Sequence, residues 1–456
     1  MSISMELLKR IEHYAKTEAQ RVALYIDDEQ LNYATLHERV KDAASRLPEY
    51  DLPLNVALSF SRIQDFVVGY LAVLSKGGTP WVMDANWSAA RKKTLYETYD
   101  IPYLWEEKGF YQRQKQSRKS LASGVLHVGF TSGTTGLPKA FLRDEASWIA
   151  SFEQNEKLMT RGQGKNHTLV ALGPYAHSLT LYVVIYALFY GRTFLGQNDY
   201  HIERCASRIA DYTDNCSLFL VPTMVYDWLQ HASQNNHVSE VFISGDKLTE
   251  QRHRLLKRIL PSAAIYEFFG TSEASFISVN MNQTAPLNSV GKVFPNVQID
   301  IRHQDEKGIG QLFVKSPMTF SGYLGDIASQ WIKTGDYAHL KEDYLYLHGR
   351  LQDRLVIGGK SVYPSVVEQQ LKQLEGVQDV IIVRQPHTKF GEVAVALYTG
   401  TQTISYRHMR AQLEKVVSRY EIPSKWIRVE KLPYISSGKV SRRIAQHLYG
   451  GGDFNE

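Results

Sequence analysis

The chain has 456 residues, of which 43% are hydrophobic and 22% charged, a composition typical of soluble globular proteins with more than one domain. Its formal net charge of +5 is small for this length, which argues against a nucleic-acid partner and allows a small anionic ligand. The two cysteines, Cys205 and Cys216, form neither a disulfide framework nor a metal-ligand spacing, and the N-terminal segment lacks the apolar stretch of a signal peptide. We therefore expect a cytoplasmic protein whose membrane contact is peripheral at most.

The first 125 or so residues alternate helical and strand patterns. Helices are predicted at 36–47 and 65–74, and strands at 53–60 and 81–83. This alternation predicts an α/β fold with layered, largely parallel sheets. The uncharged segment 178–191 is too short to span a bilayer and predicts a buried helix.

Three short apolar strands are predicted further along, at 218–221, 241–243 and 265–269. In open α/β sheets, ligands bind beyond the carboxyl ends of the strands. Each of these three strand ends is therefore a candidate wall of one binding site.

The pattern changes after about residue 290. Segments 298–302 and 311–315 flank a Gly-containing turn and predict a hairpin, which we expect to belong to a β-barrel-like subdomain. A domain boundary is predicted at Gly349–Arg350. The remainder predicts a small α+β domain, with helices at 365–374 and 406–419 and strands at 380–383 and 393–398.

The segment from Thr131 to Lys139, TSGTTGLPK, predicts a phosphate-binding loop, because it follows the apolar strand pattern 125–130. Thr131, Ser132, Thr134 and Thr135 supply hydroxyl donors, and Lys139 supplies a mobile positive charge. Gly133 and Gly136 can adopt positive φ and let the backbone approach a phosphate. Taken alone, the segment could also be an ordinary Ser/Thr-rich turn.

This loop and the motifs that follow it resemble those of the adenylate-forming superfamily of acyl-CoA synthetases, firefly-type luciferases and peptide-synthetase adenylation domains. The motifs appear in the family's order over nearly the whole chain, and the chain looks most like a compact bacterial acyl-CoA synthetase, such as a long-chain fatty acid–CoA ligase. The resemblance implies an N-terminal adenylation domain (1–349), a hinge (350–353) and a mobile C-terminal lid domain (354–456).

The resemblance also implies a nucleotide site. In FGTSE (269–273), Ser272 would meet the α-phosphate and Glu273 would hold Mg²⁺, while Asp336 would clamp the ribose and Arg350 would contact ribose or phosphate. Without the family, Glu273 reads as a helix N-terminal carboxylate and Asp336 as part of a turn. The other residues assigned to ATP or AMP are Thr131, Ser132, Gly133, Thr134, Thr135, Gly136, Lys139, Gly245, Asp246, Phe269, Gly270 and Thr271.

In the C-terminal part, LPYISSGKVSRR (432–443) resembles the family's lysine motif, which makes Lys439 the adenylation catalyst; alone, it would read as a solvated surface lysine. The turn at Gly358, Gly359 and Lys360 would bind CoA. Rotation about the hinge would then withdraw Lys439 and bring the Gly359 face to the adenylate.

The acyl pocket is expected around His177, which matches a family histidine that guards this site. Adenylation domains for amino acids usually carry an Asp near this position, whereas this chain has Ala176, which favours a plain carboxylic acid. The candidate wall residues are Val221, Met224, Phe242 and Ser244. Apolar residues of this kind would also occur in any buried strand.

We thus expect an acid–thiol ligase that uses ATP, Mg²⁺ and CoA and releases AMP and pyrophosphate. A fatty acid is the first choice of substrate, and an aryl or succinylbenzoate-like acid is the alternative. Delivery to a carrier protein and a non-catalytic nucleotide sensor remain open, as does a monomer or a homodimer. Departures from the family pattern are Ala140, Gln311, Gln352 and Ile435.

Overall fold

The structure is a computed structural model that describes residues 5–47, 54–113, 121, 124–131, 138–159, 164, 166–212, 215–245, 247–326, 329–434 and 440–450. The chain forms two compact units. The first comprises Met1–Gln298 and Val314–Ile332, and the second comprises Ile299–Phe313 and Lys333–Glu456.

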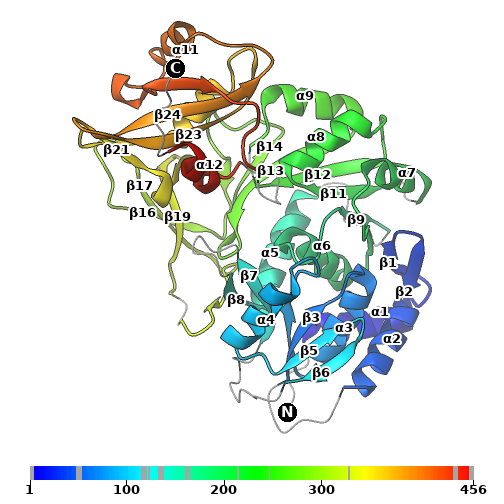
Figure 1. Ribbon diagram of the computed structural model, residues 1–456. Coiled ribbons are helices and arrows are strands. Elements are labelled where there is room, and N and C mark those ends of the chain that lie inside the picture. The colour runs from blue at the N-terminus through cyan, green and yellow to red at the C-terminus, as the bar shows by residue number, and fades with distance from the viewer. Residues whose placement is uncertain are drawn as a thin grey trace. The chain divides into compact units, whose positions relative to one another are not determined.

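The first unit contains two large sheets (Figure 1). Pairing in the first sheet is parallel from β13 to β1 and antiparallel at both ends, which confirms the predicted parallel centre. Its strands lie in the order β15 (Lys292–Val293), β14 (Ser275–Met281), β13 (Ala264–Thr271), β12 (Val238–Ser244), β11 (Cys216–Leu220), β9 (Thr168–Ala171), β10 (Thr193–Gly196), β1 (Val22–Ile26) and β2 (Glu29–Asn32).

The second sheet of this unit is seven-stranded. Its central strands pair in parallel, and antiparallel strands close both edges. The order is β18 (Gly322–Tyr323), β8 (Lys139–Asp144), β7 (Val125–Thr131), β4 (Thr79–Val82), β3 (Asn55–Ser59), β5 (Tyr103–Glu106) and β6 (Gly109–Gln112).

Helices pack on these sheets in layers (Figure 1). The helix predicted at 178–191 is α6 (Ser178–Phe189), which packs on β9, β10 and β11 and is buried along most of its length, as an all-round apolar helix must be. Within the described part of the chain, no helix is long and apolar enough to cross a bilayer. The other helices of this unit are α1 (Glu6–Thr17), α2 (Tyr33–Ser45), α3 (Ile63–Ser75), α4 (Ala89–Thr98), α5 (Glu145–Leu158), α7 (Ile202–Tyr212), α8 (Pro222–His231) and α9 (Glu250–Ile259).

The second unit contains the neighbouring strands β16 (Gln298–Arg302), β17 (Gly310–Lys315), β19 (Ile332–Lys341) and β20 (Tyr344–Arg350). The predicted hairpin corresponds to β16 and β17, while the barrel-like closure stays a prediction. A five-stranded sheet follows, with the order β22 (Lys360–Val362), β21 (Leu355–Ile357), β24 (Gly391–Gly400) and β23 (Val377–His387), and with β25 (Lys425–Arg428) paired to β24. The helical elements of this unit are η1 (Leu351–Asp353), α10 (Pro364–Leu371), α11 (Tyr406–Leu413), η2 (Arg419–Glu421) and α12 (Arg442–Tyr449).

One helix prediction was wrong at its end. The helix expected at 406–419 stops at Leu413. Ser418 forms a capping box with Glu421 and begins the separate 3₁₀ turn η2. A Ser with Glu three residues later is a helix-start signal, so it interrupts the apolar pattern that had suggested one continuous helix.

Two buried histidines of the first unit lead to a pH prediction. His127 and His167 are each 2% exposed. Burial lowers the pKa of each to about 3, because a charged imidazole would lose its hydration. The unfolded chain takes up these protons near pH 6.5, at the ordinary pKa. The free energy of unfolding should therefore fall as the pH drops from about 6.5 towards about 3, and these groups should contribute no pH dependence above that window.

Imidazole NMR signals, assigned through His127→Gln and His167→Gln variants, provide the measurement. Both rings should keep the chemical shifts of the neutral form from about pH 8 to about pH 5. A titration midpoint near pH 6.5 for either ring would contradict the prediction.

Candidate active site

The two ends of the predicted phosphate loop are held together by an antiparallel strand pair. Thr131 ends β7, Lys139 begins β8, and the two residues are paired in register. Residues Ser132, Gly133, Thr134, Thr135 and Gly136 lie outside the described residues. The strand pair therefore fixes where the loop begins and where Lys139 leaves it.

A tyrosine braces the exit of this loop. The Tyr99 hydroxyl donates a hydrogen bond to the carbonyl oxygen of Pro138 at 2.8 Å and accepts one from the amide of Ala140 at 3.2 Å. These two residues flank Lys139, so the backbone on both sides of the lysine is held by one side chain. Sequence spacing could not reveal this contact, because Tyr99 lies about forty residues upstream.

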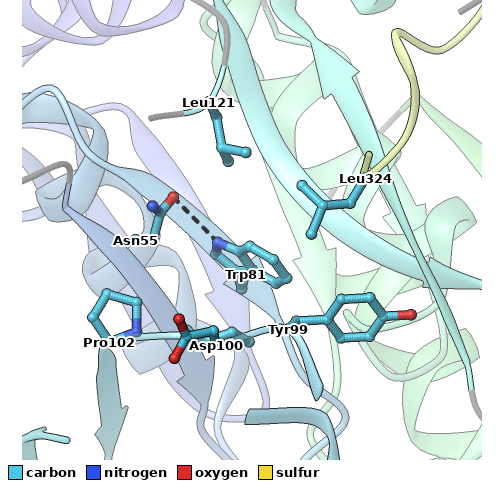
Figure 2. Close-up of a pocket in the computed structure, with 8 residues that line it drawn as sticks. Asn55, Trp81, Tyr99, Asp100, Pro102, Leu121 and Leu324 are labelled. Atoms are coloured by element: carbon cyan, nitrogen blue, oxygen red, sulfur yellow. Dashed lines mark hydrogen bonds between the residues drawn. The ribbon is translucent and has the colours of Figure 1, made fainter. Parts of the chain in front are cut away.

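A small pocket lies beside Tyr99. Figure 2 shows its lining, in which the Trp81 indole donates to the Asn55 side chain at 3.4 Å. The cavity volume is about 20 Å³, room for little more than one water, so it is far too small for a nucleotide. The lining residues are Asn55, Trp81, Tyr99, Asp100, Ile101, Pro102, Leu121 and Leu324.

The FGTSE segment lies at the end of a central strand. Phe269, Gly270 and Thr271 are the last residues of β13, and Ser272 and Glu273 form the turn into β14. At Gly270, a Cβ would lie 2.2 Å from the carbonyl oxygen of Ser275, so only glycine fits this close approach of the two strands. The turn thus follows the carboxyl end of a strand, where the sequence predicted a wall of the site.

The backbone of this turn is fixed by several hydrogen bonds. The Glu273 carbonyl accepts from the Phe320 amide at 2.7 Å, and the Ala274 amide donates to the Thr271 hydroxyl at 2.9 Å. The guanidinium of Arg143 donates to the carbonyl oxygen of Ser272. The position of Ser272 and Glu273 is therefore set by the surrounding strands.

Arg143 supports the Ser272–Glu273 turn, and the sequence analysis did not identify it as a residue of the candidate site. It lies on β8, is 3% exposed, and also donates to the Met318 carbonyl at 2.9 Å. Burial lowers its pKa to about 10, because the cation loses hydration. At neutral pH it remains charged and places a buried positive charge next to the Ser272–Glu273 turn. No local motif marks it, since its partners are distant in sequence.

Tyr323 was also missed, and it links two of the predicted residues. Its hydroxyl donates a hydrogen bond to the Glu273 carboxylate, and the Lys139 ammonium lies 5.5 Å from the centroid of its ring. Glu273 and Lys139 are far apart in the sequence, yet they meet at one side chain. The residue predicted to bind Mg²⁺ and the lysine predicted to bind phosphate thus contact the same side chain.

The expected acyl-pocket residues lie at several positions in the first unit. His177 is the N-cap of α6 and is exposed, and Val221 is the N-cap of α8. The Met224 methyl lies 3.3 Å from where a Cβ on Gly173 would be, which places it beside the β9–α6 connection that carries His177.

Phe242 and Ser244 lie on β12. Phe242 is 1% exposed and stacks on Phe219 and Phe268, with ring centroids 4.6 and 5.5 Å away. It therefore lies within a packed aromatic core. Gly245 follows the strand with φ +116°, and Asp246 lies outside the described residues.

In the second unit, the structure brings the two predicted ribose-site residues together. Asp336 on β19 pairs in register with Arg350 on β20, and their side chains form an ion pair at 2.9 Å. Arg350 also donates to the Thr334 carbonyl at 3.1 Å, and the Asp336 amide donates to the Thr334 hydroxyl at 3.1 Å. The Asp336 side chain is 6% exposed and that of Arg350 is 50% exposed, so the pair reaches from the interior to the surface.

The predicted hinge segment, 350–353, and the predicted CoA turn lie in the same unit. Arg384 donates to the Gln352 carbonyl at 3.0 Å, and Arg442 lies 3.3 Å from the Asp353 carboxylate. Gly358 and Gly359 have φ of +55° and +80° in the turn between β21 and β22, a conformation that favours glycine. Lys360 follows, with its ammonium 4.7 Å from the Tyr420 ring.

The catalytic lysine predicted from the sequence, Lys439, lies outside the described residues, as does Ile435. The flanking residues Tyr434 and Val440 form a β-bridge, which brings the two ends of the lysine segment together. Arg442, three residues after the lysine, makes a bidentate ion pair with Glu368 at 2.7 and 2.9 Å.

Comparison with known proteins identifies the family. Residues 91–324 match the model of the AMP-binding enzyme family. The chain is 44% identical over 99% of its length to "Putative long chain fatty acid-CoA ligase VraA" of Staphylococcus haemolyticus, of which 99% is covered. It is 28% identical to a 2-succinylbenzoate–CoA ligase of Staphylococcus epidermidis, over 76% of this chain and 74% of that one.

Its fold is similar to that of O-succinylbenzoate coenzyme A synthetase (MenE) from Bacillus subtilis, solved in complex with ATP and magnesium ion. The TM-score is 0.80 at 18% identity, over 95% of this chain and 98% of that one. The family match and the close full-length relative show that this chain belongs to the AMP-binding enzyme family.

Proposed function

We propose that this protein is an AMP-forming acyl-CoA ligase, which joins a carboxylic acid to ATP as acyl-AMP and then transfers the acyl group to CoA. The observation that carries the proposal is the meeting of Glu273 and Lys139 at Tyr323, at the exit of the phosphate loop. A Mg²⁺–nucleotide needs a hard carboxylate ligand for the metal and a cation for the phosphates, and this site supplies both. The full-length similarity to a fatty acid–CoA ligase supports the same reaction.

The residues fit a magnesium ion held together with substrate phosphates. Among the described residues, no three His, Cys, Asp or Glu side chains form a cluster that could hold a metal alone. Glu273 would therefore be one ligand, with phosphate oxygens and waters as the others, which is how Mg²⁺ is usually bound in nucleotide enzymes. When bound, the ion would neutralise phosphate charge and stabilise the departing pyrophosphate.

We assign the nucleotide phosphates to Lys139 and the loop 131–139, the α-phosphate to Ser272, and the ribose to Asp336 with Arg350. The Asp336–Arg350 ion pair supports the last assignment, because it holds in place a carboxylate group, whose oxygens can accept hydrogen bonds from hydroxyl groups. The main-chain clamp from Arg143 supports the position of Ser272.

We assign residues 350–353 to the hinge and 354–456 to the lid domain, with CoA at the Gly358–Gly359 turn. In support, a Cβ on Gly359 would meet no atom within 4 Å, so this turn is open to a ligand.

We propose a cytoplasmic location. In support, both cysteines are free and buried, as is usual for proteins of the reducing cytoplasm. We expect a monomer or a homodimer.

A fatty acid is the proposed substrate class, because the relative with 44% identity is named for one and because the apolar side chain of Met224 lies beside Gly173, in the connection that carries His177. Succinylbenzoate is the second candidate, since a 2-succinylbenzoate–CoA ligase matches at lower identity. Transfer to a carrier protein in place of CoA would use the same adenylation half-reaction.

Acid-dependent exchange of radioactive pyrophosphate into ATP tests the adenylation step and ranks the acids. We expect exchange with a fatty acid in the presence of Mg²⁺ and none without an acid. If ATP binds but no carboxylic acid in a broad panel supports exchange, the chain is a nucleotide sensor and the proposed reaction is wrong.

A further inference from the structure

We propose that Tyr323 is a positioning residue, which orients the Glu273 carboxylate for a divalent cation and couples it to the Lys139 end of the phosphate loop. The inference rests on the proposed function, since it concerns how that nucleotide site is built. Tyr323 has no place among the residues that the family resemblance assigns to catalysis or binding in this chain.

The strand that carries Tyr323 belongs to the phosphate-loop sheet. β18 pairs antiparallel with β8, with Tyr323 opposite Phe141, and the Leu324 amide donates to the Ala140 carbonyl at 2.9 Å. Tyr323 therefore sits at a fixed distance from Lys139 along β8. Its ring lies beside the lysine ammonium, 5.5 Å from the centroid, and ammonium–ring contacts of this length are attractive.

The hydroxyl of Tyr323 holds a side chain that the backbone hydrogen bonds of the turn leave free. The Ser272 and Glu273 carbonyls are both held, by Arg143 and by the Phe320 amide. The Glu273 side chain could still rotate, and the Tyr323 hydroxyl fixes it by donating to Oε1. The second carboxylate oxygen, Oε2, is then the one that is oriented for a cation.

The same phenol also contacts the other end of the loop. The side chain of Thr131 lies close to the Tyr323 hydroxyl. A phenol hydroxyl can donate a hydrogen bond and a carboxylate can only accept one, so Tyr323 is the donor in its contact with Glu273. One side chain thus connects Thr131 at the loop entrance, Lys139 at its exit and Glu273 opposite.

Hydrogen bonds to a metal ligand from outside the coordination sphere typically change metal affinity or activity by 10- to 100-fold. A Tyr323→Phe variant keeps the ring beside Lys139 and removes only the hydroxyl. We expect the Mg²⁺ concentration for half-maximal ATP–pyrophosphate exchange to rise about tenfold. Binding of Mn²⁺ in the presence of ATP, followed by electron paramagnetic resonance, should weaken by a similar factor, while kcat at saturating Mg²⁺ should fall much less.

Tyr96→Phe is the matched control. Tyr96 is 8% exposed on α4, and its hydroxyl has no hydrogen-bond partner among the described residues. Its loss should leave both the Mg²⁺ requirement and Mn²⁺ binding unchanged. Both variants remove one hydroxyl from a tyrosine of the same unit, so a general effect of replacing tyrosine by phenylalanine would appear in both.

Combining Tyr323→Phe with Glu273→Gln separates positioning from packing. If Tyr323 acts through Glu273, removing the hydroxyl should have little further effect on Mn²⁺ binding in a chain that already carries Glu273→Gln. Wild-type Mn²⁺ affinity in the single variant Tyr323→Phe, or full additivity in the double variant, would overturn the inference. Exchange that needs no divalent cation in the wild type would instead overturn the proposed function.

Discussion

A Glu273→Gln variant is expected to form acyl-adenylate about 100- to 1,000-fold more slowly than the wild type, the range seen when one preorganised electrostatic contact is lost. The amide has nearly the shape of the carboxylate but no charge, so it is a poor ligand for a hard cation such as Mg²⁺. Tyr323 donates to the carboxylate and Arg143 holds the adjacent carbonyl. The turn should therefore keep its place, and the loss should come from the missing charge.

Pyrophosphate exchange over a range of Mg²⁺ concentrations measures this effect. The control is Glu97→Gln, which removes an exposed carboxylate from α4. The Glu97 side chain is 55% exposed, and its carboxylate forms only a loose surface ion pair with Lys93, at 3.9 Å. The control should exchange at the wild-type rate. An unchanged Mg²⁺ requirement in Glu273→Gln would rule out Glu273 as the metal ligand.

The second large effect is expected at Lys439. Adenylation brings a carboxylate to a phosphate group, and two unit charges about 4 Å apart interact by roughly 4 kcal/mol at an effective dielectric near 20. A lysine at the reacting oxygens would offset this repulsion. We expect Lys439→Ala to lower the adenylation rate by about 100- to 1,000-fold while ATP binding largely survives.

Measuring adenylation and thioester formation separately tests the role of Lys439 more sharply than the overall rate does. If the lid domain withdraws Lys439 before thioester formation, Lys439→Ala should still convert supplied acyl-adenylate and CoA to acyl-CoA at close to the wild-type rate. Lys431→Ala, which removes an exposed lysine just before the segment 432–443, should leave both half-reactions unchanged. Equal adenylation by Lys439→Ala and the wild type would contradict the role of this lysine.

The elements that the sequence predicted well are those with a strong local pattern. The uncharged stretch at 178–191 is α6, and the apolar run at 125–130 is β7. The strands at 241–243 and 265–269 are the centres of β12 and β13, which extend further at both ends. Strand ends depend on pairing with neighbours, and the extent of pairing is not encoded in one strand's own periodicity.

The candidate site could be predicted in part. Four residues that the sequence assigned to the site form two pairs across neighbouring strands. Thr131 pairs with Lys139, and Asp336 pairs with Arg350. The supporting side chains could not be predicted. Arg143, Tyr99 and Tyr323 each act through a hydrogen bond to a residue that is distant in sequence, and only the fold brings the two partners together.

Product analysis by mass spectrometry tests the central claim most directly. Purified protein is incubated with ATP, Mg²⁺, CoA and a pooled panel of fatty, aryl and succinylbenzoate-like acids. The account predicts a new acyl-CoA together with an equal amount of AMP. Formation of AMP or acyl-adenylate without a thioester would contradict the assignment of CoA as the acceptor, and formation of ADP with an acyl-CoA would contradict the adenylate mechanism.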